Sequence, residues 1–171
     1  MNEDLVSVIM PAFNSERYIV ESIESILNQT YRNIELLITD DGSEDNTISI
    51  IKSYAQKDSR VKAFFLKGNT GAGSARNNSI KHAKGRYIAF CDSDDVWLPE
   101  KLEKQIRFMQ EKNCCFAFAS YYVFDSESRK KGIVLAPSSV SLIDTKRDDK
   151  IGFLTAVYDT SFYGKFYMPT L

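Results

Sequence analysis

Ile34-Glu-Leu-Leu-Ile-Thr-Asp-Asp-Gly-Ser43 is the stretch of sequence that decides the fold. Its first six residues are a mostly apolar run, which predicts a buried strand over residues 34–39. The run stops at two aspartates and a glycine, and we expect Ser43 to cap the helix that follows. A buried strand leading through an acidic turn into a helix is typical of α/β proteins.

The same alternation of strand and helix continues on both sides of this stretch. Apolar runs predict further strands at 5–12, 61–66 and 87–91, one long strand at 114–124 and an edge strand at 133–135. Apolar residues at helical spacing predict helices at 19–29, 44–55, 72–84 and 98–109. We expect Asn14-Ser15 to cap the first helix and Gly85 to end the third. This order predicts an α/β sandwich with a mainly parallel central sheet.

Composition places the chain among soluble globular proteins of one domain. It has 171 residues, 43% of them hydrophobic, with 22 basic against 23 acidic side chains. A net charge of −1 argues against a nucleic-acid-binding protein, and no lysine cluster suggests a membrane anchor. Three cysteines, two of them adjacent, form neither a disulfide framework nor a metal motif. Without a leader or a transmembrane run, we expect a cytoplasmic protein.

Polar residues follow three of the predicted strands. Phe13-Asn14 comes after the first strand, Asp40-Asp41 after the second, and Asp92-Ser93-Asp94-Asp95 after the strand at 87–91. In parallel sheets, ligands bind beyond the carboxyl ends of the strands. We therefore expect these groups to converge at one edge of the sheet.

Asp92 and Asp94 are the strongest candidates for metal binding. Residues i and i+2 of an extended chain project to the same side, so both carboxylates could reach one ligand. Close carboxylates repel unless a cation lies between them, and oxygen ligands favour Mg²⁺ or Mn²⁺, which commonly bridge to phosphates. The plainer alternative is a solvated turn that caps the next helix.

Three other positions at this edge each allow two interpretations. Asp41 could accept a hydrogen bond from the imide N–H of a nucleobase, or could belong to a helix cap and turn. Phe13 could stack on a base or pack in the core. Arg76, near a helix start beside the loop 68–73, could bind a phosphate or form a surface ion pair.

Several familiar sites are not predicted. The loop 68–73 has the pattern G-x-x-G-x-G and does not follow the first strand, which argues against a dinucleotide site. No P-loop motif is present. His82 is the only histidine, and we expect it at the surface of a helix, so a histidine triad or a zinc site is not supported.

Five blocks of the sequence together resemble the inverting family 2 glycosyltransferases with the GT-A fold. They are Val6-Ser-Val-Ile-Met-Pro-Ala-Phe-Asn14, Ser25-Ile-Leu-Asn-Gln-Thr-Tyr31, Ile34 to Ser43, Asn69-x-Gly71 with Ala75-Arg-Asn77, and Asp92-Ser-Asp-Asp95. The resemblance covers roughly residues 5 to 125, which it identifies as the nucleotide-sugar-binding part. It implies transfer of a sugar, with a UDP-sugar favoured, to an acceptor hydroxyl with inversion, in cell-surface polysaccharide or glycan biosynthesis.

The resemblance also assigns roles at the donor site. The donor-binding residues that it implies are Pro11, Ala12, Phe13, Asn14, Asp40, Asp41, Asn69, Gly71, Arg76, Asp92, Ser93 and Asp94. Within this set, Pro11 to Phe13 cradle the base and Asp41 contacts it. Asp94 is the more direct ligand of Mg²⁺ or Mn²⁺, and Asp92 lies nearer the ribose. Arg76 and the metal would stabilise the leaving diphosphate while a general base deprotonates the acceptor.

The sequence departs from the family pattern at the general base. In the family this base is an acidic residue in the half that follows these motifs, often within a Glu-Asp pair. No glutamate follows Glu127. Four aspartates remain in that half, but the sequence around them does not identify one as the general base: Asp144, Asp148, Asp149 and Asp159. We therefore expect the base beyond Leu171, with residues 126–171 forming the incomplete start of an acceptor part within a single domain, 1–171, truncated at its C-terminus.

The resemblance also suggests partners. A glycan or lipid-linked acceptor is expected, with peripheral association at the inner face of a membrane. Two alternatives stay open on the sequence: a nucleotidyltransferase on a related scaffold, and a non-catalytic nucleotide-binding module.

Overall fold

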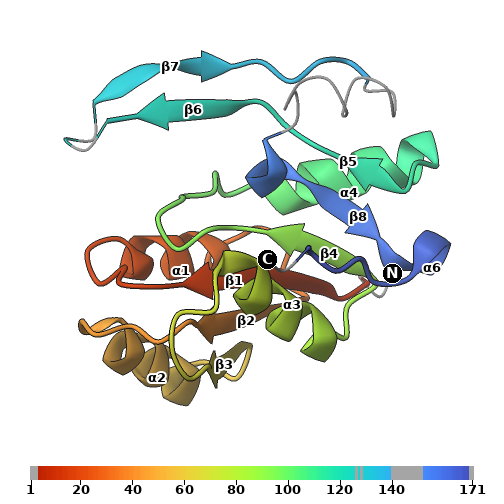
Figure 1. The fold of residues 1–171 in the computed structure, drawn as a ribbon. Helices are drawn as coiled ribbons and strands as arrows, with labels where there is room; N and C mark the ends of the chain where they lie inside the picture. The colour runs from red at the N-terminus through yellow and green to blue at the C-terminus, as the bar shows by residue number, and fades with distance from the viewer. Residues whose placement is uncertain (1–3, 126, 128, 140–151, 170–171) are drawn as a thin grey trace.

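A six-stranded sheet forms the centre of the computed structural model, which describes residues 4–125, 127, 129–139 and 152–169 (Figure 1). The strand order is β3-β2-β1-β4-β8-β5. The parallel strands are β1 (Val6–Ala12), β2 (Ile34–Asp40), β3 (Val61–Phe65) and β4 (Tyr87–Phe90). β8 (Val157–Asp159) runs antiparallel to β4 and to β5 (Phe116–Ala117). The mainly parallel α/β fold is therefore confirmed.

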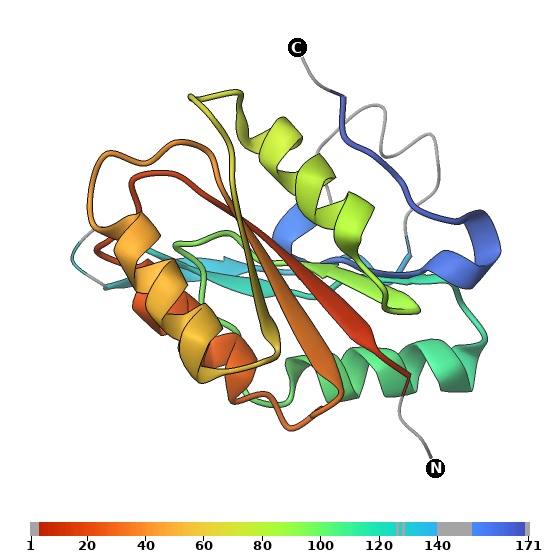
Figure 2. The same cartoon turned by 90° about the horizontal axis from the view of Figure 1, so that it is seen from below.

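Helices cover both faces of this sheet (Figure 2). One face packs against α1 (Ile19–Leu27), α2 (Thr47–Lys57) and α4 (Lys101–Lys112), and the opposite face packs against α3 (Ala72–His82). Every residue of β1, β2 and β4 is buried, because helices lie above and below these strands. Their apolar side chains alternate between the two layers, so that Val8 faces one core and Ile9 the other.

One helix cap and one helix start differ from the expectation. α1 begins at Ile19 as predicted, but no side chain of Asn14-Ser15 caps it, and the Ile19 N–H donates instead to the Ser15 carbonyl oxygen at 3.0 Å. α2 begins at Thr47 rather than after Ser43. The Ser43 hydroxyl is occupied elsewhere, because it donates to Asp40 and accepts from the Asn14 N–H.

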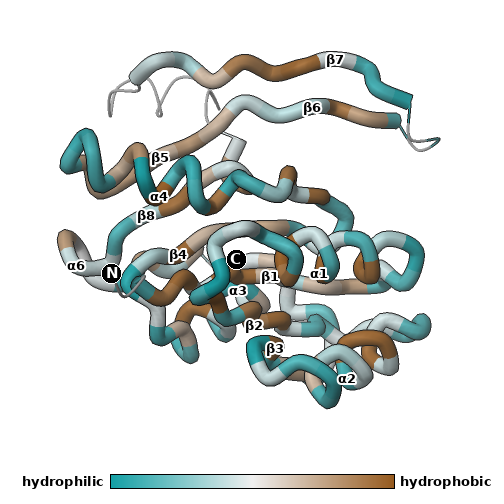
Figure 3. Tube along the Cα trace, turned by 180° about the vertical axis from the view of Figure 1, so that it is seen from behind, coloured by the Kyte–Doolittle hydropathy of each residue, from teal (hydrophilic) through white to brown (hydrophobic). Residues whose placement is uncertain are grey.

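The prediction of one long strand at 114–124 is wrong. The segment breaks into β5 and β6 (Tyr121–Phe124), which belong to different sheets. β8 inserts beside β5, and the Ala119 N–H donates to the Thr155 hydroxyl at 3.1 Å, which bends the chain between the two strands. β6 then pairs with β7 (Lys130–Val134) as a separate hairpin. Figure 3 shows hydrophobic stretches in this hairpin as well as in the central strands.

Gly85 does not end α3, which stops at His82 with an extended residue at Ala83. A Cβ at position 85 would lie 2.6 Å from the Ser7 backbone nitrogen and 2.7 Å from the Leu5 carbonyl oxygen. The glycine is therefore required where the turn before β4 passes close to β1.

Two short elements complete the described fold. The 3₁₀ turn η1 (Phe153–Thr155) precedes β8, and α6 (Thr160–Tyr163) follows it. In the part of the chain that the structure describes, no helix combines the length and the apolar character that a bilayer span needs.

Candidate functional site

The carboxyl ends of β1 and β2 meet at one edge of the sheet. Ala12, the last residue of β1, pairs with Asp40, and the Asp41 N–H donates to the Ala12 carbonyl oxygen at 2.9 Å. Pro11 and Ala12 are buried here, whereas the Phe13 ring is 43% exposed. Phe13 therefore presents an aromatic face at the strand end, as stacking on a base requires.

Asn14 and Asp40 shape the loops at this edge. Asn14 adopts the left-handed conformation with φ of 47°, which asparagine tolerates well, and its side-chain oxygen accepts from the Glu44 N–H at 2.9 Å. The buried Asp40 carboxylate accepts from the Gly42 and Ser43 N–H groups at 3.1 and 3.0 Å. Asp40 thus shapes the turn after β2, and Asn14 joins that turn to the turn after β1.

Asp41 holds the loop before α3. Its carboxylate, only 2% exposed, accepts from the Thr70 N–H at 2.9 Å, the Thr70 hydroxyl at 2.7 Å and the Gly71 N–H at 2.7 Å. The Asn69 side-chain oxygen also accepts from the Gly71 N–H, at 3.2 Å. These bonds join the end of β2 to the loop at residues 69–71. Thr70 and Gly71 lie 29 and 30 positions after Asp41 in the sequence.

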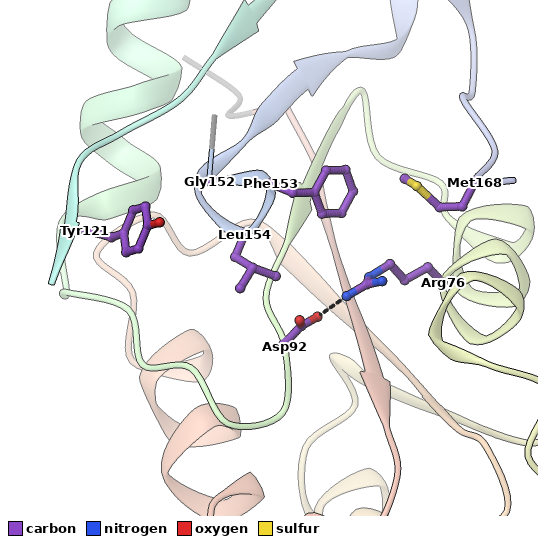
Figure 4. Close-up of a pocket in the computed structure, with 7 residues that line it drawn as sticks. All are labelled: Arg76, Asp92, Tyr121, Gly152, Phe153, Leu154 and Met168. Atoms are coloured by element: carbon purple, nitrogen blue, oxygen red, sulfur yellow. Dashed lines mark hydrogen bonds and ion pairs between the residues drawn. The ribbon is translucent and has the colours of Figure 1, made fainter. Parts of the chain in front are cut away.

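Arg76 and Asp92 form an ion pair next to this loop. Arg76 projects from the second turn of α3, and its Nη2 lies 2.6 Å from Asp92 Oδ1 (Figure 4). The Arg76 Nε is buried and has no hydrogen-bond partner among the described residues. Its guanidinium carbon lies 5.5 Å from the centre of the Phe153 ring.

The acidic loop after β4 carries unbalanced negative charge. Burial and, to a lesser degree, the charges of Asp94 and Asp92 together raise the pKa of Asp95 to about 6. Burial also raises the pKa of Asp92, although the Arg76 guanidinium opposes that change. Asp94 is exposed to solvent, whereas Ser93 is buried. A bound cation would relieve the repulsion among these carboxylates.

A divalent metal fits this donor set. Asp92 and Asp94 offer carboxylate oxygens, which Mg²⁺ and Mn²⁺ prefer. Within the described ranges, no three acidic, histidine or cysteine side chains form a ready metal cage. Such a cage is not needed here, because Mg²⁺ usually binds through one or two carboxylates and completes its coordination with water and substrate phosphates.

A pocket of about 460 Å³ opens beside the ion pair. Its lining residues are Arg76, Asp92, Tyr121, Gly152, Phe153, Leu154 and Met168 (Figure 4). Only the first two were candidates from the sequence. The others come from the second half of the chain, where no periodic pattern or motif singled them out. Their shared feature is their position in space, which only the fold reveals.

Asn77 brings Met168 into the pocket wall. Its side-chain nitrogen donates to the Met168 carbonyl oxygen at 2.8 Å, and its side-chain oxygen accepts from the Met168 N–H at 2.6 Å. This pair of hydrogen bonds fixes the backbone of the last described segment against α3.

Asp159 is the one described residue among the four late aspartates, since Asp144, Asp148 and Asp149 lie outside the described residues. It is buried and accepts from Arg86 Nε at 3.0 Å and Nη2 at 2.8 Å. Although burial opposes it, these bonds and those from Ser161 lower the pKa of Asp159. This carboxylate therefore serves a structural ion pair.

A mainly parallel sheet with an acidic loop and an arginine at its carboxyl edge is typical of α/β proteins that bind ligands beyond the ends of their strands. A model of the family described as glycosyl transferase family 2 matches residues 7–166. The chain belongs to this family, which confirms the resemblance found in the sequence motifs.

Two curated relatives and one solved structure illustrate the relationship. The chain is 41% identical over 169 residues to the UDP-Glc:alpha-D-GlcNAc-diphosphoundecaprenol beta-1,3-glucosyltransferase WfgD of Escherichia coli, covering 99% of this chain and 66% of that protein. WfaP of Escherichia coli, which has the same activity in its name, is 47% identical over 122 residues, covering 70% of this chain and 47% of that protein.

The structural relative is S. aureus TarS 1-349 in complex with UDP-GlcNAc. It matches with a TM-score of 0.73 at 28% identity, covering 91% of this chain and 45% of that one. The fold is therefore that of the GT-A glycosyltransferases. This chain spans about two thirds of the length of WfgD and less than half of TarS 1-349. The family assignment does not favour the nucleotidyltransferase alternative.

Proposed function

We propose that this chain is the nucleotide-sugar-binding part of an inverting glycosyltransferase that uses a UDP-sugar as donor. The observation that carries the proposal is the Arg76–Asp92 pair, with Asp94 beside it, at the carboxyl edge of the sheet. The names of WfgD and the TarS complex, which specify UDP-Glc and UDP-GlcNAc, support a uridine nucleotide.

The donor would lie across the strand ends from Phe13 to Asp92. The exposed Phe13 ring would stack on the base, with Pro11, Ala12 and Asn14 forming the adjoining wall. Asp41, supported by Asp40, would face the base and would hold Asn69 and Gly71 of the loop before α3 close to the nucleotide.

The charged residues would stabilise the negative charge of the leaving diphosphate. Asp94 and Asp92, with Ser93 between them, would hold Mg²⁺ or Mn²⁺. When bound, the metal would supply positive charge that stabilises the departing diphosphate. Arg76, next to Asp92, would contribute a second positive charge. Attack by the acceptor hydroxyl opposite the leaving group would invert the anomeric carbon.

The acceptor in this proposal is a glycan or lipid-linked saccharide of cell-surface polysaccharide biosynthesis. The name of WfgD specifies an acceptor linked to diphosphoundecaprenol, which supports the proposal that the acceptor is lipid-linked. We place the reaction on the cytoplasmic side, with peripheral contact to the membrane that holds such an acceptor. The general base belongs to the acceptor part of the whole enzyme.

Calorimetric titration of UDP into the purified chain tests the proposal. We expect binding in Mn²⁺ that is lost in EDTA. Asp94→Asn should weaken binding in Mn²⁺ about tenfold or more, because it removes one charge from the metal site. The matched control is Glu111→Gln on α4, which neutralises an exposed carboxylate far from the acidic loop and should leave the affinity unchanged.

Two results would each reject one part of the proposal. Absence of binding to UDP, GDP, CDP and dTDP in the presence of Mn²⁺ would remove the donor-binding function. Full metal-dependent affinity in Asp94→Asn would instead remove Asp94 from the metal site.

A further inference from the structure

Phe153 lies between the end of β4 and Arg76. The centre of its ring is 4.2 Å from the centre of the Phe90 ring, and Phe90 is buried just before the acidic loop. The Arg76 guanidinium carbon is 5.5 Å from the Phe153 ring centre, within the range of a cation–π contact. Figure 4 shows the Phe153 ring close to Arg76, whose guanidinium points to Asp92. Phe153 thus links the core to a charged group of the site.

The turn that carries Phe153 is held in place from several sides. The Thr155 hydroxyl and N–H both donate to the Gly152 carbonyl oxygen, at 2.7 and 2.8 Å. Gln105 of α4 donates to the Thr155 carbonyl oxygen at 2.9 Å, and the Ala119 N–H donates to the Thr155 hydroxyl. Because η1 is fixed to α4 and to the segment before β6, it presents the ring from a defined position.

Arg76 depends on such a support. Its long side chain loses rotamer freedom when it is held in one geometry. One end is fixed by the ion pair to Asp92 at 2.6 Å, while the buried Nε finds no hydrogen-bond partner in the described parts of the chain. The face of Phe153 supplies the second point of contact, which keeps the guanidinium at Asp92.

We infer that Phe153 is a positioning residue for the donor site: its ring holds the Arg76 guanidinium beside Asp92 before the diphosphate arrives. This inference rests on the proposed function, because the diphosphate is the ligand that Arg76 would meet. Holding the cation in place lowers the ordering cost of binding, so the effect is expected in donor affinity.

The test is a double-mutant cycle read by UDP titration in Mn²⁺. Phe153→Leu should weaken UDP binding about three- to tenfold, which is the size of a partly desolvated cation–π contact. Phe153→Tyr, which keeps the ring face, should retain the affinity. In an Arg76→Gln background, Phe153→Leu should have no further effect, because the group that it supports is gone. Phe108→Leu, on an exposed aromatic of α4, is the matched control.

A second measurement needs no nucleotide. In the NMR spectrum, the Arg76 side-chain protons near the ring face should be shifted upfield, and Phe153→Leu should move them downfield while leaving the spectrum of α4 unchanged. Equal losses of affinity from Phe153→Leu in both backgrounds would overturn the inference, as would unmoved Arg76 resonances. Failure of the wild-type chain to bind UDP would reject the proposed function instead, and the NMR result would still decide the position of Arg76.

Discussion

At the residue scale, the carboxylates of this site fall into two kinds. Asp40 and Asp41 accept hydrogen bonds from neighbouring backbone groups and so organise loops. Asp92 and Asp95 have raised pKa values, chiefly because burial disfavours their charge. Carboxylates that accept several hydrogen bonds hold the loops, whereas the acidic loop after β4, with three carboxylates beside the one guanidinium of Arg76, is suited to a bound cation.

Asp41→Asn tests the first role. The change places an amide nitrogen opposite the N–H donors of Thr70 or Gly71, so one of them loses its acceptor. We expect a loss of about 1–3 kcal/mol in the free energy of unfolding, measured by urea titration. Hydrogen exchange at the Gly71 amide should become faster. Asp94→Asn, at an exposed carboxylate, should change stability by less than about 0.5 kcal/mol. An Asp41→Asn chain with wild-type stability and exchange would contradict this role.

At the element scale, the sequence predicts strands better than helix starts. β1, β2 and β4 are buried on both faces, so burial alone imposes continuous apolar runs that are visible in the sequence. The start of α2 depends on Asp45, which accepts from the Thr47 N–H at 2.9 Å, and on a distant partner, Glu16, which accepts from the Asn46 N–H at 3.0 Å. No local pattern encodes that contact, which is why the Ser43 cap was wrong.

The same contrast applies to the site. The residues that were predicted from motifs, such as Arg76 and Asp92, do lie together in the structure. Phe153 could not be predicted, because its importance comes from η1 being placed against α3 by long-range packing. The β5–β6 break has a similar origin, since it follows from the insertion of β8.

Gly85→Ala tests the close approach of the turn before β4 to β1. The new methyl group would meet backbone atoms of Leu5 and Ser7, which cannot move aside as a flexible side chain would. Overpacking of this kind should reduce the free energy of unfolding by about 1–3 kcal/mol in denaturant titration. Gly132→Ala is the control, because the space around position 132 is open. Equal stabilities of the two variants would show that the turn can shift.

At the scale of the whole molecule, one partly buried lysine connects stability to pH. Lys101 lies with its Nζ 3.9 Å from the centre of the Trp97 ring and 2.7 Å from the Gln105 side-chain oxygen. Burial lowers the pKa of Lys101 to about 7. In the unfolded chain this amine titrates near its ordinary value of about 10.4. Between these values the unfolded state binds more protons, so the contribution of Lys101 makes stability rise with pH.

Lys101→Met removes this contribution. Relative to wild type, the variant should be most stable near pH 6, where the buried amine is charged, and the difference should shrink as pH rises from about 7 to 9. Urea unfolding at pH 6, 7.5 and 9 measures the difference. Lys104→Met, at an exposed i,i+4 pair with Glu100, should give a difference that is independent of pH over this range. A constant offset for Lys101→Met would contradict the lowered pKa.

The position of β8 has a consequence for synthesis on the ribosome. β1 to β4 emerge first, yet the edge of β4 that faces away from β1 pairs with residues 157–159, and Arg86 contacts Asp159 across 73 positions of sequence. Until β8 emerges, the nascent sheet exposes an unpaired edge next to a buried apolar strand. The interval between translation of β4 and β8 is therefore the period in which this chain is most exposed to aggregation and most dependent on chaperones.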